Sequence, residues 1–130
     1  ERVARQVSDV AGALSGRTAR LLADTYGMCA LEIASQVRKD PAQGEPLIEG
    51  RPEILGQVDW AVHQELAATV SDFMIRRTQL YYRDFDQGLK AAETVADRMA
   101  MLLGWDEQTR QASLDDYRAE VGRSRAWQTE

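Results

Sequence analysis

The chain has 130 residues, which is enough for one compact domain with a hydrophobic core. Its net charge of −5 comes from 16 basic and 21 acidic residues spread along its length, so no basic patch indicates nucleic-acid binding. No run of about 18 apolar residues is present, which excludes a membrane-spanning helix.

Apolar residues recur at helical spacing from the first residue onward. The first expected helix covers residues 1–14. The second covers residues 17–26, with Ser15 as its N-cap and Gly27 at the left-handed C-cap that glycine prefers. A third helix over residues 28–38 should stop before Asp40-Pro41.

Residues 40–52 hold all three prolines and form the one long loop. Pro46, Leu47 and Ile48 are apolar, so we expect this loop to pack on the core. The fourth helix covers residues 53–66. Thr69 and Asp72 then form a T-x-x-D variant of the capping box, which predicts a break before a fifth helix from residue 70 to about 83.

The cleanest amphipathic pattern covers residues 87–103 and ends at Gly104. Asp106 caps a last helix that runs to about residue 125. No segment alternates with period two over a useful length. The sequence therefore predicts an all-α fold, a single compact bundle of six or seven short to medium helices.

Two charged residues fall on or beside the apolar stripes of the fourth and fifth helices. On an α-helical wheel Arg77 lies in the middle of one stripe, and Glu65 lies at the flank of the other. A lone buried charge is costly, so we expect Glu65 and Arg77 to pair. The pair either locks the angle between two helices or reaches a neighbouring domain or a substrate phosphate.

Asp72 and Arg76 form a favourable surface pair, and exposed Arg76 is the better candidate for an inter-domain contact.

The sequence contains no G-x-G-x-x-G, no phosphate loop and no nucleophile elbow. The single histidine, His63, lies one turn from Asp59, and two ligands make a weak metal site, so a solvated or hydrogen-bonded histidine is favoured. The single cysteine, Cys29, stands among apolar residues and is expected to be a buried thiol. We therefore predict no catalytic, cofactor-binding or metal-binding residues in this chain.

Three motifs in register resemble the C-terminal helical domain of aerobic, FAD-dependent glycerol-3-phosphate dehydrogenases and the related α-glycerophosphate oxidases. One is an L-x-x-x-Y-G ending at Gly27, and another is V-A-x-x-M-A-x-x-L-G-W-D ending at Asp106. The central motif consists of His63, Glu65, Ala67, Thr69, Asp72, Arg76, Arg77 and Thr78. From it, Glu65, Thr69, Asp72, Arg76, Arg77 and Thr78 are carried over as a structural ion-pair and capping signature, because no catalytic residue of the family maps onto this chain.

The resemblance implies a parent enzyme with an N-terminal FAD domain and a substrate-binding cap. This parent would oxidise sn-glycerol 3-phosphate to dihydroxyacetone phosphate and pass electrons to a quinone, or to oxygen in the oxidase branch. It would be cytoplasmic or attached to the inner face of the membrane.

Because the first residue is Glu and not Met, we expect the chain to be a piece of that longer protein. Residues 1–16 would be a linker or leading helix from the preceding domain, and residues 17–130 the C-terminal helical domain. Its partners would be the FAD and cap domains of the same chain, or a second copy in a homo-oligomer. The fragment itself would hold no cofactor and would be inactive alone. The alternative is an independent helical protein-interaction module that binds a partner helix in a groove.

Overall fold

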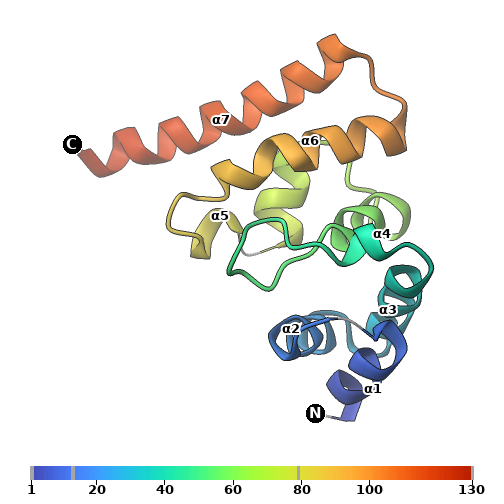
Figure 1. Ribbon diagram of the computed structural model, residues 1–130. Coiled ribbons are helices and arrows are strands. Elements are labelled where there is room, and N and C mark those ends of the chain that lie inside the picture. The colour runs from blue at the N-terminus through green and yellow to red at the C-terminus, as the bar shows by residue number, and fades with distance from the viewer. Residues whose placement is uncertain (1, 13, 79, 130) are drawn as a thin grey trace. The chain divides into compact units, whose positions relative to one another are not determined.

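The computed structural model describes residues 2–12, 14–78 and 80–129, and Figure 1 shows that these ranges are built from helices and loops. The prediction of an all-α fold is confirmed, since the described residues contain no strand. The chain divides into two compact units, residues 1–60 and residues 61–130. The boundary falls inside helix α4 (Gly56–Gln64), where no change of composition marks it. Within the described ranges, no helix is both long enough and apolar enough to cross a membrane.

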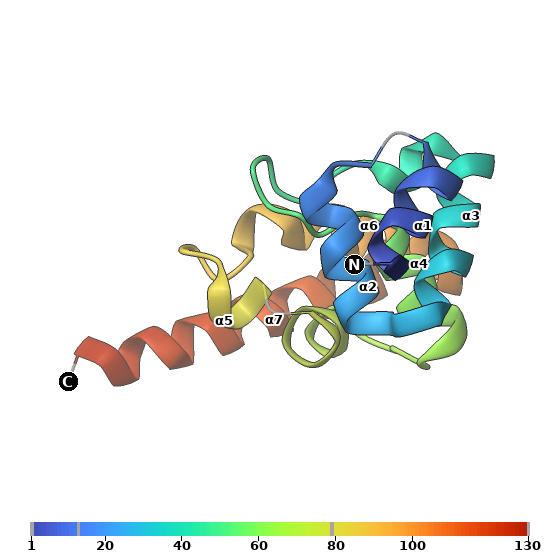
Figure 2. The ribbon, with the colours of Figure 1, turned by 90° about the horizontal axis from the view of Figure 1, so that it is seen from below.

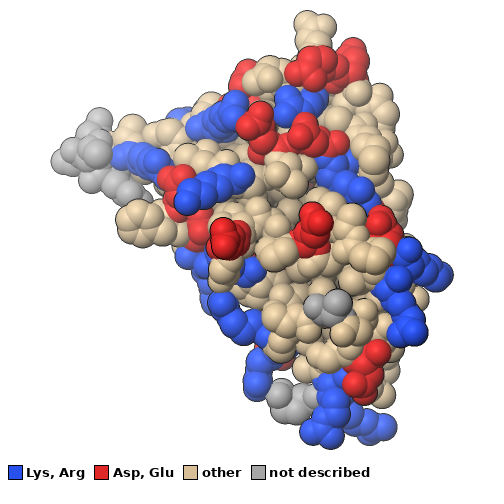
Figure 3. Space-filling model, in the orientation of Figure 1, with Lys and Arg blue, Asp and Glu red and all other residues tan. Residues whose placement is uncertain are grey.

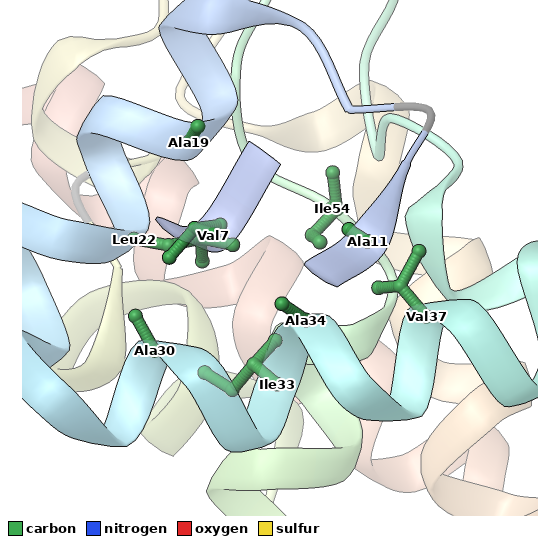
Figure 4. Close-up of a cluster of buried hydrophobic side chains, with 9 residues drawn as sticks. All are labelled: Val7, Ala11, Ala19, Leu22, Ala30, Ile33, Ala34, Val37 and Ile54. Atoms are coloured by element: carbon green, nitrogen blue, oxygen red, sulfur yellow. The ribbon is translucent and has the colours of Figure 1, made fainter. Parts of the chain in front are cut away.

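The first unit is built on three helices, α1 (Arg2–Ala11), α2 (Gly16–Tyr26) and α3 (Ala30–Lys39), which Figures 1 and 2 show in blue to cyan. Apolar residues from all three helices meet in one cluster, drawn in Figure 4, which also takes in a residue of the following loop. Residues 1 and 13, which the predicted first helix included, lie outside the described residues. The cluster consists of Val7, Ala11, Ala19, Leu22, Ala30, Ile33, Ala34, Val37 and Ile54.

Local signals set the ends of α2. The Ser15 hydroxyl oxygen accepts a hydrogen bond from the Thr18 amide at 3.1 Å, and Gly27 follows the helix with a φ of +58°. The expected N-cap is therefore confirmed. Gly27 is the C-cap and has a positive φ, but its ψ of −133° lies outside the left-handed helical region that was expected. A short 3₁₀ turn, η1 (Gly27–Cys29), then leads into α3 and leaves both Met28 and Cys29 exposed. The prediction of a buried Cys29 thiol is wrong, because this turn places the residue on the outer side of the junction.

The proline-rich loop packs on its own unit through backbone and side-chain bonds. It contains a 3₁₀ turn, η2 (Pro41–Gly44), and an isolated antiparallel bridge between Pro46 and Ile54. The Thr18 hydroxyl donates to the Pro52 carbonyl at 2.8 Å, and Leu47 is buried. The expectation that the loop packs on the core is confirmed for Leu47, and the bridge explains why α4 starts at Gly56 and not at residue 53.

The second unit contains the six-residue π-helix η3 (Asp72–Arg77), followed by α5 (Leu80–Arg83), α6 (Leu89–Leu103) and α7 (Glu107–Thr129). Helices α6 and α7 contact one another and run antiparallel, as the orange and red ribbons of Figure 1 show. The buried side chains include Val70, Phe73, Met74, Leu80, Ala92, Val95, Met99, Leu114, Tyr117 and Val121.

The junction between α6 and α7 follows the sequence prediction closely. Gly104 has a φ of +71°, and the amide of Trp105 donates to the Ala100 carbonyl at 3.0 Å. The Asp106 carboxylate accepts a hydrogen bond from the Thr109 amide at 2.8 Å. This backbone bond is the largest cause that lowers the pKa of Asp106, and a hydrogen bond from the Thr109 side chain is the second. The expected glycine C-cap and aspartate N-cap are both confirmed.

Arg110 ties the start of α7 to α6. Its guanidinium lies 2.5 Å from Asp97 and 3.7 Å from Glu93 on α6, and 3.4 Å from Glu107 on its own helix. The hydrogen bond to Asp97 is the main cause that raises the pKa of Arg110. On the face shown in Figure 3, basic and acidic side chains are interspersed, which agrees with their even distribution in the sequence.

Candidate functional site

The segment from Glu65 to Thr78, which carries the six signature residues, begins with a sharp change of chain direction after α4. The amides of Glu65 and Ala67 both donate to the Ala61 carbonyl, at 3.1 and 3.0 Å. Between them Leu66 adopts a φ of +58° and leaves 84% of its surface exposed. A left-handed conformation is unfavourable for a residue with a branched side chain. The connection between α4 and the next helical segment, which we call the joint, therefore stores backbone strain at Leu66.

Thr69 and Asp72 bond to the backbone at the start of the next helical segment. The Asp72 amide donates to the Thr69 hydroxyl oxygen at 3.0 Å, which is the N-cap geometry. The Asp72 carboxylate accepts from the Ala68 amide at 3.0 Å, one residue earlier than in a standard capping box. The same carboxylate lies 3.7 Å from the guanidinium of Arg76, whose side chain is largely exposed. These residues form a polar cap on the solvent side of the joint.

Glu65 and Arg77 do not form the expected buried ion pair. Arg77 is exposed, and its guanidinium donates to the main-chain carbonyl of Glu65 at 3.2 Å, with no bond to the Glu65 carboxylate. Among the described residues, the buried Oε1 atom of Glu65 has no hydrogen-bond partner. The prediction of a carboxylate–guanidinium pair is therefore wrong.

The π-helix is the physical reason for this error. Its hydrogen bonds span i→i+5, so each residue turns through less than the about 100° of an α-helix. Over the seven steps from Val70 to Arg77 this difference moves Arg77 off the buried stripe, whereas Phe73 and Met74, which come earlier, stay buried. Arg77 still joins the two ends of the segment, through the backbone of Glu65. The role of the six residues as a family signature stays a prediction.

Thr78 ends the π-helix. Its buried hydroxyl lies 3.4 and 3.2 Å from the carbonyl oxygens of Phe73 and Met74, and it accepts a hydrogen bond from the Leu80 amide at 3.3 Å. The hydroxyl thus takes over bonds that a continuing helix would make in the backbone. This explains why the single helix expected over residues 70–83 is divided into η3 and α5.

A tight turn over residues 84–88 joins α5 to α6. The Asp84 carboxylate accepts hydrogen bonds from the amides of Asp86 and Gly88, at 3.2 and 3.0 Å. Gln87 and Gly88 follow with φ values of +53° and +75°. The Tyr117 hydroxyl donates to the Gln87 carbonyl and holds the turn against α7. Burial raises the pKa of Tyr117, because the ionised phenolate would lose its hydration.

Beside this turn the second unit has an open hollow of about 710 Å³, which we call the aromatic hollow. The rings of Tyr81 and Tyr82 meet edge to face, with centroids 4.9 Å apart and planes at 88°. Phe85 is fully exposed and Tyr82 is 66% exposed. The hollow is lined by Tyr81, Tyr82, Asp84, Phe85, Asp86, Gln87, Ser124 and Arg125. Sequence reasoning missed it, although an aromatic residue placed between two acids in a turn, Asp84-Phe85-Asp86, was a visible signal.

The residues considered for a metal site are not brought into a cluster. Among the described residues, no group of three or more His, Cys, Asp or Glu side chains could hold a metal ion. His63 is exposed at the end of α4. The acidic pairs at 106–107 and 115–116 lie at the start and on the exposed side of α7.

Comparison with known proteins gives one family and a consistent set of relatives. The family model of the C-terminal domain of alpha-glycerophosphate oxidase matches residues 1–110. The chain is 32% identical over 93 residues to a probable mitochondrial glycerol-3-phosphate dehydrogenase of Dictyostelium discoideum, covering 72% of this chain and 14% of that protein. It is 29% identical to the human mitochondrial enzyme over 109 residues, covering 81% of this chain and 15% of that protein. It is 28% identical to the aerobic glycerol-3-phosphate dehydrogenase of Bacillus subtilis over 109 residues, covering 82% of this chain and 19% of that protein. The chain thus spans less than a fifth of each of these relatives.

Proposed function

The chain belongs to the family of C-terminal domains of alpha-glycerophosphate oxidase, and from this premise we propose that it is the C-terminal domain of an FAD-dependent glycerol-3-phosphate dehydrogenase. The observation that carries the proposal is the family match over residues 1–110, which includes all six signature residues from Glu65 to Thr78. The relatives named as glycerol-3-phosphate dehydrogenases support the same reading. None of these observations favours an independent interaction module.

In the proposed parent enzyme, sn-glycerol 3-phosphate is oxidised to dihydroxyacetone phosphate and the electrons pass to a quinone. The flavin supplies the redox chemistry when it is bound. The parent is cytoplasmic or lies peripherally on the inner face of a membrane. The domain's partners are the FAD and cap domains of the same chain.

The residues of this chain do not fit the flavin. Dinucleotide sites of this kind use a strand, a glycine-rich turn and a helix N-terminus to hold the pyrophosphate. The described residues contain no strand, and Gly27 and Gly104 serve as helix C-caps. We therefore propose that this chain acts as a packing domain on the catalytic part of the enzyme.

Flavin reduction in the full-length parent tests this proposal. Anaerobic addition of glycerol 3-phosphate to the purified protein should bleach the absorbance of its bound flavin, and glycerol at the same concentration should not. A parent without flavin, or one whose flavin is reduced equally by glycerol, would rule out the proposed reaction.

A further inference from the structure

We propose that the aromatic hollow is a binding site for an organic cation, either a quaternary ammonium group or the ammonium or guanidinium group of a basic side chain. This proposal rests on the second unit alone and does not depend on the reaction catalysed by the parent.

The walls of the hollow offer aromatic surface of the kind that binds cations. The Tyr81 and Tyr82 rings stand at 88° to one another, so two walls meet at nearly a right angle. Tyr81 also contacts Tyr117 edge to face, with centroids 6.3 Å apart, and Tyr117 is fully buried. This contact fixes one wall to the core of the unit. Cations bind to aromatic faces through the ring quadrupole, and several rings around one cation form an aromatic cage.

Phe85 adds an aromatic side chain whose apolar surface is not buried within the unit. It is fully exposed, and neighbouring Tyr82 is 66% exposed. Both residues line the hollow. Large apolar side chains that lie together on a surface mark interaction sites, whereas scattered single ones need no explanation. The backbone at Phe85 is fixed by the turn around it, because the Asp84 carboxylate accepts hydrogen bonds from the amides of Asp86 and Gly88.

The charge of the lining selects a cation over an anion. Asp84 and Asp86 contribute two carboxylates, and Arg125 contributes one guanidinium, so the lining carries a net negative charge. Arg125 is held by Asp86 Oδ1 at 2.8 Å and by the side-chain oxygen of Gln87 at 2.8 Å. Its charge is thus already compensated within the wall. The described contacts of Asp84 use only Oδ2, which leaves Oδ1 outside them.

The size of the hollow suits such a ligand. At about 710 Å³ it falls in the range of small-molecule sites, and it can admit a whole basic side chain or a choline-sized ion. Because it is open, we expect weak binding, with Kd values on the order of millimolar.

Nuclear magnetic resonance of the isotope-labelled 130-residue chain tests the proposal. Choline is the probe, and 3,3-dimethylbutan-1-ol is its neutral counterpart of the same shape. We expect saturable shifts at residues 81–88 and 124–125 with choline, and binding of the alcohol at least about fivefold weaker, since it lacks the charge. A second arm uses N-acetyl-lysine and N-acetyl-arginine methylamides. Tighter binding of choline assigns the site to a small cation, and tighter binding of these amides assigns it to a protein side chain.

Variants locate the binding. Phe85→Ala should weaken choline binding about three- to fivefold, and Tyr82→Ala provides a second, independent test at an exposed side chain. Met101→Ala is the matched control, because Met101 is also a large exposed apolar residue of the second unit but does not line the hollow. Any one of three results would overturn the proposal. The neutral alcohol binds as tightly as choline, no cation gives a saturable shift, or both aromatic variants bind choline with unchanged affinity.

Discussion

Replacement of Gly88 by alanine tests the packing of the turn that builds the second unit. An added Cβ would lie 2.4 Å from the Met74 Cε atom, 3.3 Å from Leu80 Cβ and 3.4 Å from the Tyr117 hydroxyl. The Met74 methyl group can move, but it lies in a fully buried side chain, so the movement disturbs the core. Such overpacking costs about 1–3 kcal/mol. The left-handed conformation, with a φ of +75°, adds about 1–2 kcal/mol. We expect Gly88→Ala to lower the free energy of unfolding by about 2–5 kcal/mol.

Gly104→Ala is the matched control for this experiment. Gly104 has a nearly identical φ of +71°, and its added Cβ would meet nothing within 4 Å. It should therefore show only the conformational cost of about 1–2 kcal/mol. The assay is urea denaturation followed by circular dichroism, with the two variants and the unsubstituted 130-residue chain measured together. Equal destabilisation by the two substitutions would refute the close approach of Gly88 to Met74, Leu80 and Tyr117.

Substitutions at three further positions of the second unit give the remaining predictions. Tyr117→Phe removes the hydrogen bond to the Gln87 carbonyl and should cost about 1–2 kcal/mol in urea denaturation; no loss would contradict that bond. Because burial raises the pKa of Tyr117 above its ordinary value of about 10, its contribution to stability is present below about pH 10 and is lost as the pH rises further. Above about pH 10, the free energy of unfolding should thus fall less steeply in Tyr117→Phe than in the unsubstituted 130-residue chain. Identical pH profiles of the two chains would contradict this. Thr69→Ala should cost about 1 kcal/mol and Thr69→Ser should recover most of it, whereas equal stabilities of all three chains would mean that the N-cap bond is absent. Arg77→Ala should cost less than about 1 kcal/mol, because among the described residues the exposed guanidinium bonds only to the Glu65 carbonyl. A loss of several kcal/mol in a thermal melt would instead support the buried ion pair.

Elements with strong local signals could be predicted from the sequence. Ser15 and Gly27 mark the ends of α2, and Gly104 and Asp106 mark the junction of α6 and α7, each through its own backbone geometry. These features depend on residues within one helical turn, so no tertiary information is needed. The apolar stripe of α6 could be predicted in part for the same reason. Ala92, Val95, Ala96 and Met99 are fully buried, whereas Leu103, also expected to face inward, is 41% exposed.

The joint between α4 and α5 could not be predicted in the same way. The π-helix depends on the hydroxyl of Thr78 and on the buried neighbours Phe73 and Met74, which an α-helical wheel cannot represent. The left-handed conformation of Leu66 runs against its local preference and requires the surrounding structure to hold it. The aromatic hollow combines residues about 40 positions apart in the chain, Tyr81 to Asp86 with Arg125, and this proximity exists only after folding.

Dye-linked oxidation of glycerol 3-phosphate, measured side by side on the full-length parent and on the isolated 130-residue chain, tests the central claim most directly. The proposed role as a non-catalytic C-terminal domain predicts turnover by the full-length flavoprotein and a rate equal to buffer for the isolated chain. Turnover by the isolated chain, or a full-length protein that holds flavin but does not oxidise glycerol 3-phosphate, would contradict it.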